Sequence, residues 1–168
     1  RQMCIRDSIY GISAFGLGKQ LGITRNLAAE YMAMYFEKYP GVKQYMESTK
    51  ESASQNGYVE TLFGRWLYLK EINANNALRR QASERAAINA PVQGTAADIM
   101  KIAMIRMYQA LEKEKSEARI ILQVHDELIL DTPEKEIDRV IELTSEAMKE
   151  ATLLDLSLIH ISEPTRQA

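Results

Sequence analysis

Cysteine, proline and long apolar runs are all scarce in this sequence. Its 168 residues include one cysteine and four prolines. A single cysteine, Cys4, cannot form an internal disulfide, so a small disulfide scaffold is excluded. The apolar runs extend over only a few residues, far short of the roughly 20 that a transmembrane helix needs. With no basic and apolar leader, we expect a protein of a reducing cytoplasm that has no membrane partner.

An excess of charge of one sign is also lacking, because 21 Lys and Arg residues face 23 Asp and Glu residues. The distribution is uneven, since residues 111–156 carry 6 basic and 13 acidic groups and residues 1–110 are mildly basic. A protein that binds nucleic acid by charge alone is expected to be strongly basic. Any polyanion therefore binds at a local site.

Helices outnumber strands in the predicted order of elements. Apolar spacing and caps predict a helix from Thr24 to Tyr39 and a second helix that ends at Gly57. A β-hairpin is expected over 58–69, where Gly64 supplies the positive φ of a tight turn. Helices and hairpins in this order predict an α+β fold rather than a wound parallel sheet.

The second half of the chain is expected to repeat this pattern. A long helix over 76–114 contains Pro91, which predicts a kink, and a last helix begins at Thr132-Pro133. A second hairpin lies between these helices. The expected buried faces of the two helices are Ile99, Ile102, Ile105, Met107 and Leu111, and then Ile137, Val140, Ile141, Thr144 and Met148.

Three stretches contain candidate functional residues, and the first is Val-His-Asp-Glu at 124–127, near the tip of the second hairpin. Neighbouring carboxylates attract a hard cation such as Mg²⁺, which prefers oxygen ligands and keeps several waters. By strand alternation, Gln123 and His125 are expected to share one face and Asp126 to turn to the other. Taken alone, the tetrapeptide is more often an ordinary polar turn.

The second candidate is a polar ladder of Arg85, Asn89 and Gln93, spaced four residues apart on the long helix. These side chains reach acceptor atoms in the DNA minor groove, and the neighbouring alanines allow a bulky ligand to approach. A solvated face or a buried hydrogen-bond network remains the alternative. The third candidate is Tyr10-Gly11, where a ring beside bare backbone suits stacking on a base, or ordinary packing.

Five blocks in this order resemble DNA polymerases of family A. They are YGISAFGLGKQLGI, YFEKYPGV, GYVETLFGRWLYL, ERAAINAPVQGTAADI and QVHDELIL, and they cover essentially all of residues 9–156. The related single-subunit RNA polymerases usually have serine where this chain has Glu127. The resemblance therefore favours the DNA enzyme over these relatives.

The resemblance implies part of a right-hand polymerase: mainly helical fingers over 9–57, and a fingers and palm portion with antiparallel hairpins over 58–156. Residues 1–8 and 157–168 resemble translated sequencing-adapter read-through, and we expect both segments to be non-native. The implied activity is template-directed DNA synthesis in replication and repair. The implied setting is a monomer in the bacterial cytoplasm, with primer–template DNA, dNTP substrates and two Mg²⁺ ions.

The resemblance also implies a role for each candidate residue. Tyr10, beside Gly11, stacks at the nucleotide insertion site. Asp126 is a catalytic, metal-binding aspartate, and Glu127 supports it. The residues implied to contact primer–template DNA are Arg85, Asn89, Gln93, Gln123 and His125.

Two departures from the family pattern bear on activity. The family's other metal-binding aspartate lies in a block like DYSQIELR, which does not occur in this sequence. The lysine and the aromatic residue expected before Tyr10 fall at Gln2 and Arg6. We therefore expect the 168-residue chain to bind dNTP poorly and not to extend primers. A non-catalytic duplex-DNA-binding module and a structural scaffold with an internal ladder are the alternatives.

Overall fold

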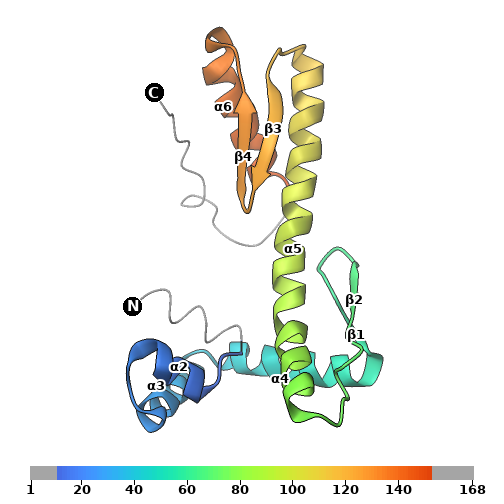
Figure 1. Ribbon diagram of the computed structural model, residues 1–168. Helices are drawn as coiled ribbons and strands as arrows, with labels where there is room; N and C mark the ends of the chain where they lie inside the picture. The colour runs from blue at the N-terminus through green and yellow to red at the C-terminus, as the bar shows by residue number, and fades with distance from the viewer. Residues whose placement is uncertain (1–10, 153–168) are drawn as a thin grey trace. The chain divides into compact units, whose positions relative to one another are not determined.

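The computed structural model describes residues 11–152, which form two compact units that divide between Thr95 and Ala96. The division falls within one long helix, α5 (Ala77–Glu114), which is drawn green to yellow in Figure 1. The helices and hairpins predicted within the described residues are present, so the α+β prediction is confirmed. None of the described helices is long and apolar enough to span a membrane.

Within the described residues, the first unit begins with three helices whose ends follow from local sequence. They are α2 (Ala14–Leu21), α3 (Arg25–Lys38) and α4 (Pro40–Asn56). The predicted N-cap Thr24 is confirmed, because its hydroxyl accepts a hydrogen bond from the Leu27 amide at 3.3 Å. Gly57 ends α4 in the left-handed region, with φ 77°, as its position predicted.

A short hairpin then packs against the start of α5. Strands β1 (Tyr58–Glu60) and β2 (Trp66–Tyr68) are antiparallel, with Tyr58 opposite Tyr68. Gly64 has φ 82°, which confirms the turn predicted there. The core of this unit consists of Ala53, Val59, Leu69, Ile72 and Ala87. Small side chains on α4 and α5 let the hairpin approach both helices closely.

The second unit contains a hairpin of β3 (Arg119–Val124) and β4 (Glu127–Asp131). Ile120 pairs with Leu130 and Leu122 pairs with Ile129, so Ile121 is the extra residue of a β-bulge. A bulge reverses which side chains face each side of the sheet beyond it. This explains why the apolar alternation in RIILQV is weak.

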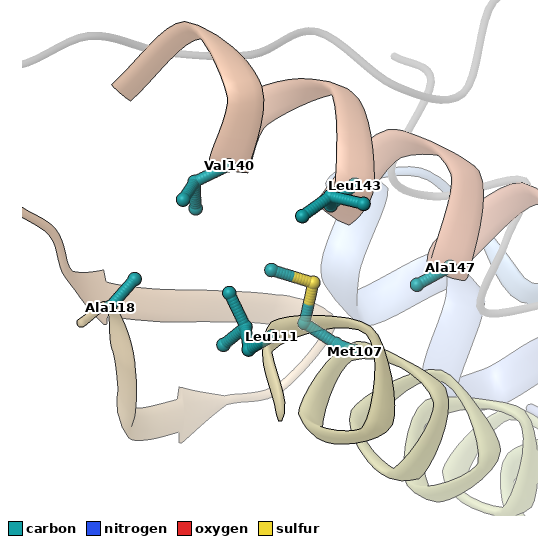
Figure 2. Close-up of a cluster of buried hydrophobic side chains, with 6 residues drawn as sticks. All are labelled: Met107, Leu111, Ala118, Val140, Leu143 and Ala147. Atoms are coloured by element: carbon teal, nitrogen blue, oxygen red, sulfur yellow. The ribbon is translucent and has the colours of Figure 1, made fainter. Parts of the chain in front are cut away.

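The core of the second unit lies between α5, the hairpin and α6 (Ile137–Lys149), and Figure 2 shows its buried side chains converging. They are Met107, Leu111, Ala118, Val140, Leu143 and Ala147. The predicted buried face of the last helix was only partly right. Val140 is buried, but Ile137, Ile141, Thr144 and Met148 are half-buried, and the buried stripe runs through Leu143 and Ala147 instead.

The start of the last helix also differs from the prediction. Pro133 precedes a short 3-10 turn, Glu134–Glu136, and α6 itself begins only at Ile137. The predicted face of α5 needs a similar correction, since Ile105 is 57% exposed whereas Met100 and Ala103 are buried.

Candidate nucleic-acid interface

The polar ladder lies on one face of α5 in the first unit. Arg85 and Gln93 are exposed and Asn89 is half-buried. Pro91 lies inside α5, which Figure 1 draws as one continuous helix, so a spacing of four residues keeps the three side chains in one row. The kink expected at Pro91 remains a prediction. The two ends of the row, Arg85 and Gln93, thus lie at the surface, whereas Asn89 between them is partly covered.

Asn89 has an incomplete set of hydrogen bonds. Its Oδ1 atom is buried and has no hydrogen-bond partner among the described residues. A buried acceptor left in this state costs about 1–3 kcal/mol. The unpaired acceptor argues against a fully satisfied internal network. It does not identify a ligand, because the minor-groove atoms N3 and O2 are themselves acceptors.

The third candidate stretch meets the ladder. Gly11 has φ 76°, and a Cβ atom at that position would lie 3.2 Å from Cγ of Arg85 and 3.4 Å from Cδ1 of Ile88. Only glycine fits both this φ and this close approach without strain. Tyr10 lies outside the described residues. Its neighbour in the chain nevertheless packs directly on the first residue of the ladder.

A tyrosine from α4 holds the same part of α5. The hydroxyl of Tyr45 donates a hydrogen bond to the Ile88 carbonyl oxygen at 2.9 Å. Burial raises the pKa of Tyr45 above its usual value, so the hydroxyl keeps its proton at neutral pH and remains a donor. This contact was not predictable from the sequence, because nothing in the local pattern shows which tyrosine meets the helix.

The tip of the first hairpin is fastened to α5 just after Gln93. Arg65 Nη2 donates to the Gly94 carbonyl oxygen at 3.0 Å, and the Leu62 amide donates to Thr95 Oγ1 at 2.9 Å. A Cβ atom at Gly94 would lie only 2.6 Å from Cγ2 of Thr61, a contact that real structures essentially never show. Gly94 and Thr95 of the block QGTAAD therefore form a docking point for the hairpin, which we call the hairpin clamp.

The acidic turn of the second unit joins β3 to β4. Val124 pairs with Glu127, which leaves His125 and Asp126 as the turn itself. The expectation that His125 shares a strand face with Gln123 was wrong, because His125 has left the strand and adopts φ 52°. Instead, Gln123 Nε2 donates to the His125 carbonyl oxygen at 2.6 Å and holds the turn.

The turn carries some of the oxygen ligands that a magnesium site needs. Asp126 and Glu127 are both exposed, and carboxylates are the ligands with which Mg²⁺ binds while it keeps several waters. Within residues 11–152 no group of three or more His, Cys, Asp or Glu side chains is arranged to hold a metal. The donor set therefore fits one side of a site and needs further ligands to complete it.

The ladder and the acidic turn belong to different units, the first ending at Thr95 and the second beginning at Ala96. The DNA contacts predicted for the ladder and for the acidic turn both remain predictions. Comparison with known proteins shows that one family profile matches both units. The sequence profile of DNA polymerase family A matches residues 6–162.

This chain belongs to DNA polymerase family A. It is 52% identical over 151 residues to DNA polymerase I of Pseudomonas aeruginosa and 49% identical over 150 residues to that of Geobacillus stearothermophilus. These matches cover 90% and 89% of this chain, but only 16% and 17% of the relatives. The chain thus spans about a sixth of the length of these DNA polymerases.

A solved structure gives the same family assignment. The POL domain of Pol1 from M. smegmatis, in complex with DNA primer-template and dNTP, aligns with a TM-score of 0.89 and 41% identity. The alignment covers 92% of this chain and 27% of that one. The resemblance carried by the five sequence blocks is confirmed, and with it the α+β architecture of a family A polymerase fragment.

Proposed function

We propose that this chain is part of a DNA-directed DNA polymerase that performs template-directed nucleotidyl transfer in replication and repair. The observation that carries the proposal is the row of Arg85, Asn89 and Gln93, with Gly11 packed on its first member, in a family A chain. The partners proposed are primer–template DNA and dNTP. The POL domain structure of the mycobacterial relative contains both, which supports this choice.

The ladder is proposed to check base-pair geometry in the minor groove. Purine N3 and pyrimidine O2 are acceptors in every Watson–Crick pair, so guanidinium and amide donors can contact any correct pair. A mispaired primer terminus displaces these acceptors and loses the hydrogen bonds. The hairpin clamp holds α5 beside Gln93, and Tyr45 holds it beside Asn89, so both side chains start from a fixed backbone.

The acidic turn is proposed to hold Mg²⁺ through Asp126, with Glu127 in support. When bound, Mg²⁺ supplies Lewis-acid stabilisation of the primer 3′-hydroxyl and of the leaving pyrophosphate. The chain's own contribution is to place the carboxylate at a rigid turn that Gln123 fastens, and His125 is proposed to contact the DNA from the same turn. Tyr10 is proposed to stack at the insertion site beside Gly11.

The finer properties are proposed by analogy with the bacterial relatives. We propose a monomer that acts in the bacterial cytoplasm, as part of a longer polymerase. The 168-residue chain alone is expected not to extend a primer, because no block like DYSQIELR occurs in it to supply the second metal-binding aspartate. Mg²⁺-dependent primer extension by the purified chain would contradict this expectation.

The experiment that tests the proposal is a chimera, in which residues 9–156 replace the matching segment of Pseudomonas aeruginosa DNA polymerase I. We expect Mg²⁺-dependent primer extension, and near-complete loss of it in Asp126→Asn with DNA binding retained. Asp131→Asn is the matched control, because Asp131 is an exposed aspartate of the same hairpin. A non-catalytic DNA-binding module instead predicts that the two variants behave alike.

A further inference from the structure

Three aromatic rings gather on one face of the first hairpin. The ring centroids of Tyr58 and Trp66 lie 4.5 Å apart in a stacked arrangement, and Tyr68 lies 6.0 Å and 6.3 Å from them. Strand alternation and the pairing of Tyr58 with Tyr68 place all three on the same side. We call this set the aromatic platform.

The platform is exposed although it is large and apolar. Trp66 is 51% exposed and Tyr68 is 64% exposed. Indole and phenol rings normally account for much of the buried area of a core or an interface. Large side chains that face solvent together therefore indicate a surface that binds something.

The hairpin that carries the platform is rigidly held. Its tip is fixed by the hairpin clamp at Gly94 and Thr95, and Val59 and Leu69 are buried in the core of the unit. The rings thus lose little conformational entropy when a ligand stacks on them. This preorganisation separates the platform from a set of mobile surface side chains.

A basic hollow adjoins the platform within the same unit. It has a volume of about 450 Å³, and Tyr68 forms part of its lining together with Lys70 and Arg79. Glu71 is the acidic group in the lining, and its carboxylate lies 3.9 Å from Nη1 of Arg79 across an exposed gap. An exposed ion pair of this length contributes little, so a phosphate can replace it at low cost.

We propose that the aromatic platform and the basic hollow bind single-stranded DNA. A base stacks on the exposed rings of Trp66 and Tyr68, and Lys70 and Arg79 contact the phosphates beside it. Stacked rings next to cations are the usual means of binding an unpaired strand, whereas a duplex keeps its base faces covered. The choice of DNA rests on the proposed function, but the binding itself needs neither the ladder nor a metal.

The protein contains its own reporter for this site, because Trp66 is the only tryptophan. We expect an oligothymidylate of about 12 nucleotides to quench Trp66 fluorescence of the full chain and to saturate. Tyr68→Ala should weaken this binding by about 5- to 150-fold, the range seen on removal of one stacking side chain. Tyr68→Phe retains the ring and should restore the affinity.

The charge contacts have a separate signature. The double variant Lys70→Gln, Arg79→Gln should reduce the dependence of log affinity on log salt concentration by about 1.4, or about 0.7 for each lost phosphate contact. Tyr31→Ala is the matched control, because Tyr31 is 50% exposed on α3 and lies outside the platform. It should leave both the affinity and the salt dependence unchanged.

Duplex DNA separates this inference from the proposed function. A blunt duplex bound through the ladder should change the anisotropy of a labelled DNA and lose affinity in Arg85→Ala, without quenching Trp66. Absence of quenching by the single strand, or equal quenching by the blunt duplex, would overturn the inference while duplex binding stands. A Trp66 signal that depends on protein concentration without DNA would overturn it too, because the rings would then cover a second copy of the chain.

Discussion

Gly94→Ala tests the most specific packing relation in the first unit. The added Cβ would lie 2.6 Å from Cγ2 of Thr61 and 3.2 Å from Nη2 of Arg65, so the tip of the hairpin must move. Overpacking of this kind typically costs about 1–3 kcal/mol. Movement also weakens the hydrogen bonds to Gly94 and Thr95, each worth about 1 kcal/mol. The better helix propensity of alanine returns about 1 kcal/mol.

We therefore expect Gly94→Ala to lower the free energy of unfolding of the first unit by about 2 kcal/mol. Urea denaturation followed by Trp66 fluorescence measures this, because the sole tryptophan lies in the affected hairpin. Gly41→Ala is the matched control: Gly41 is also helical, and a Cβ atom added there would meet nothing within 4 Å. That variant should be neutral or more stable.

A second substitution, at Thr61, tests whether the clash with its Cγ2 atom causes the loss of stability. Thr61→Ser removes the Cγ2 atom that the new Cβ strikes, but keeps the Oγ1 that accepts a hydrogen bond from the Arg65 amide. In the Gly94→Ala background it should recover most of the lost stability. A Gly94→Ala protein as stable as the parent, or a double variant no better than the single one, would refute the account of the hairpin clamp.

Three further predictions concern the ladder, the acidic turn and the second unit. Arg85→Ala should raise the dissociation constant about tenfold for A·T-rich and G·C-rich duplexes alike, because both present the same minor-groove acceptors. Fluorescence anisotropy measures this, and a loss confined to one base composition would contradict the proposed readout. His125→Gly relieves a left-handed conformation that costs about 1–2 kcal/mol in a non-glycine residue, but it also raises the backbone entropy of the unfolded chain. These effects oppose each other, so denaturation should show a change in the free energy of unfolding of no more than about 1 kcal/mol. The affinity for duplex DNA should fall. The Ser116 hydroxyl donates to Glu136 and lowers the pKa of that carboxyl below its ordinary 4.5, so this contribution to stability is present above pH 4.5 and is lost as pH falls through the lower, folded-state pKa. Glu136→Gln should flatten the acid limb of the thermal-unfolding profile measured by circular dichroism, and an unchanged limb would show that Glu136 is not its cause.

Local features of the fold were predictable from the sequence because their causes are local. Thr24 and Gly57 act as caps through bonds to residues three or four positions away, and Gly64 marks its turn through backbone conformation alone. Other features depend on distant partners. The bulge at Ile121 depends on how β3 pairs with β4, and no pattern within RIILQV shows it.

The candidate site likewise has features that the sequence predicted and features that it did not. Residue type and spacing predicted that Arg85, Asn89 and Gln93 form a row, and the helix places them in one. Their binding role stays a prediction. Spacing did not indicate that Gly11 packs on Arg85 or that Arg65 binds the Gly94 carbonyl, because these residues are far apart in sequence. The glycine within QGTAAD was the one available signal, since a glycine inside a helix often marks a close approach.

The central claim is the proposal that both the ladder and the acidic turn bind primer–template DNA. Directed hydroxyl-radical cleavage tests it, with an iron chelate attached to Asp126→Cys in a Cys4→Ser background, which leaves one thiol in the chain. On a primer–template duplex we predict cuts clustered at the primer 3′ end, and loss of these cuts when Arg85→Ala is added. Cuts spread evenly along the duplex, or a cluster that Arg85→Ala leaves intact, would contradict the claim.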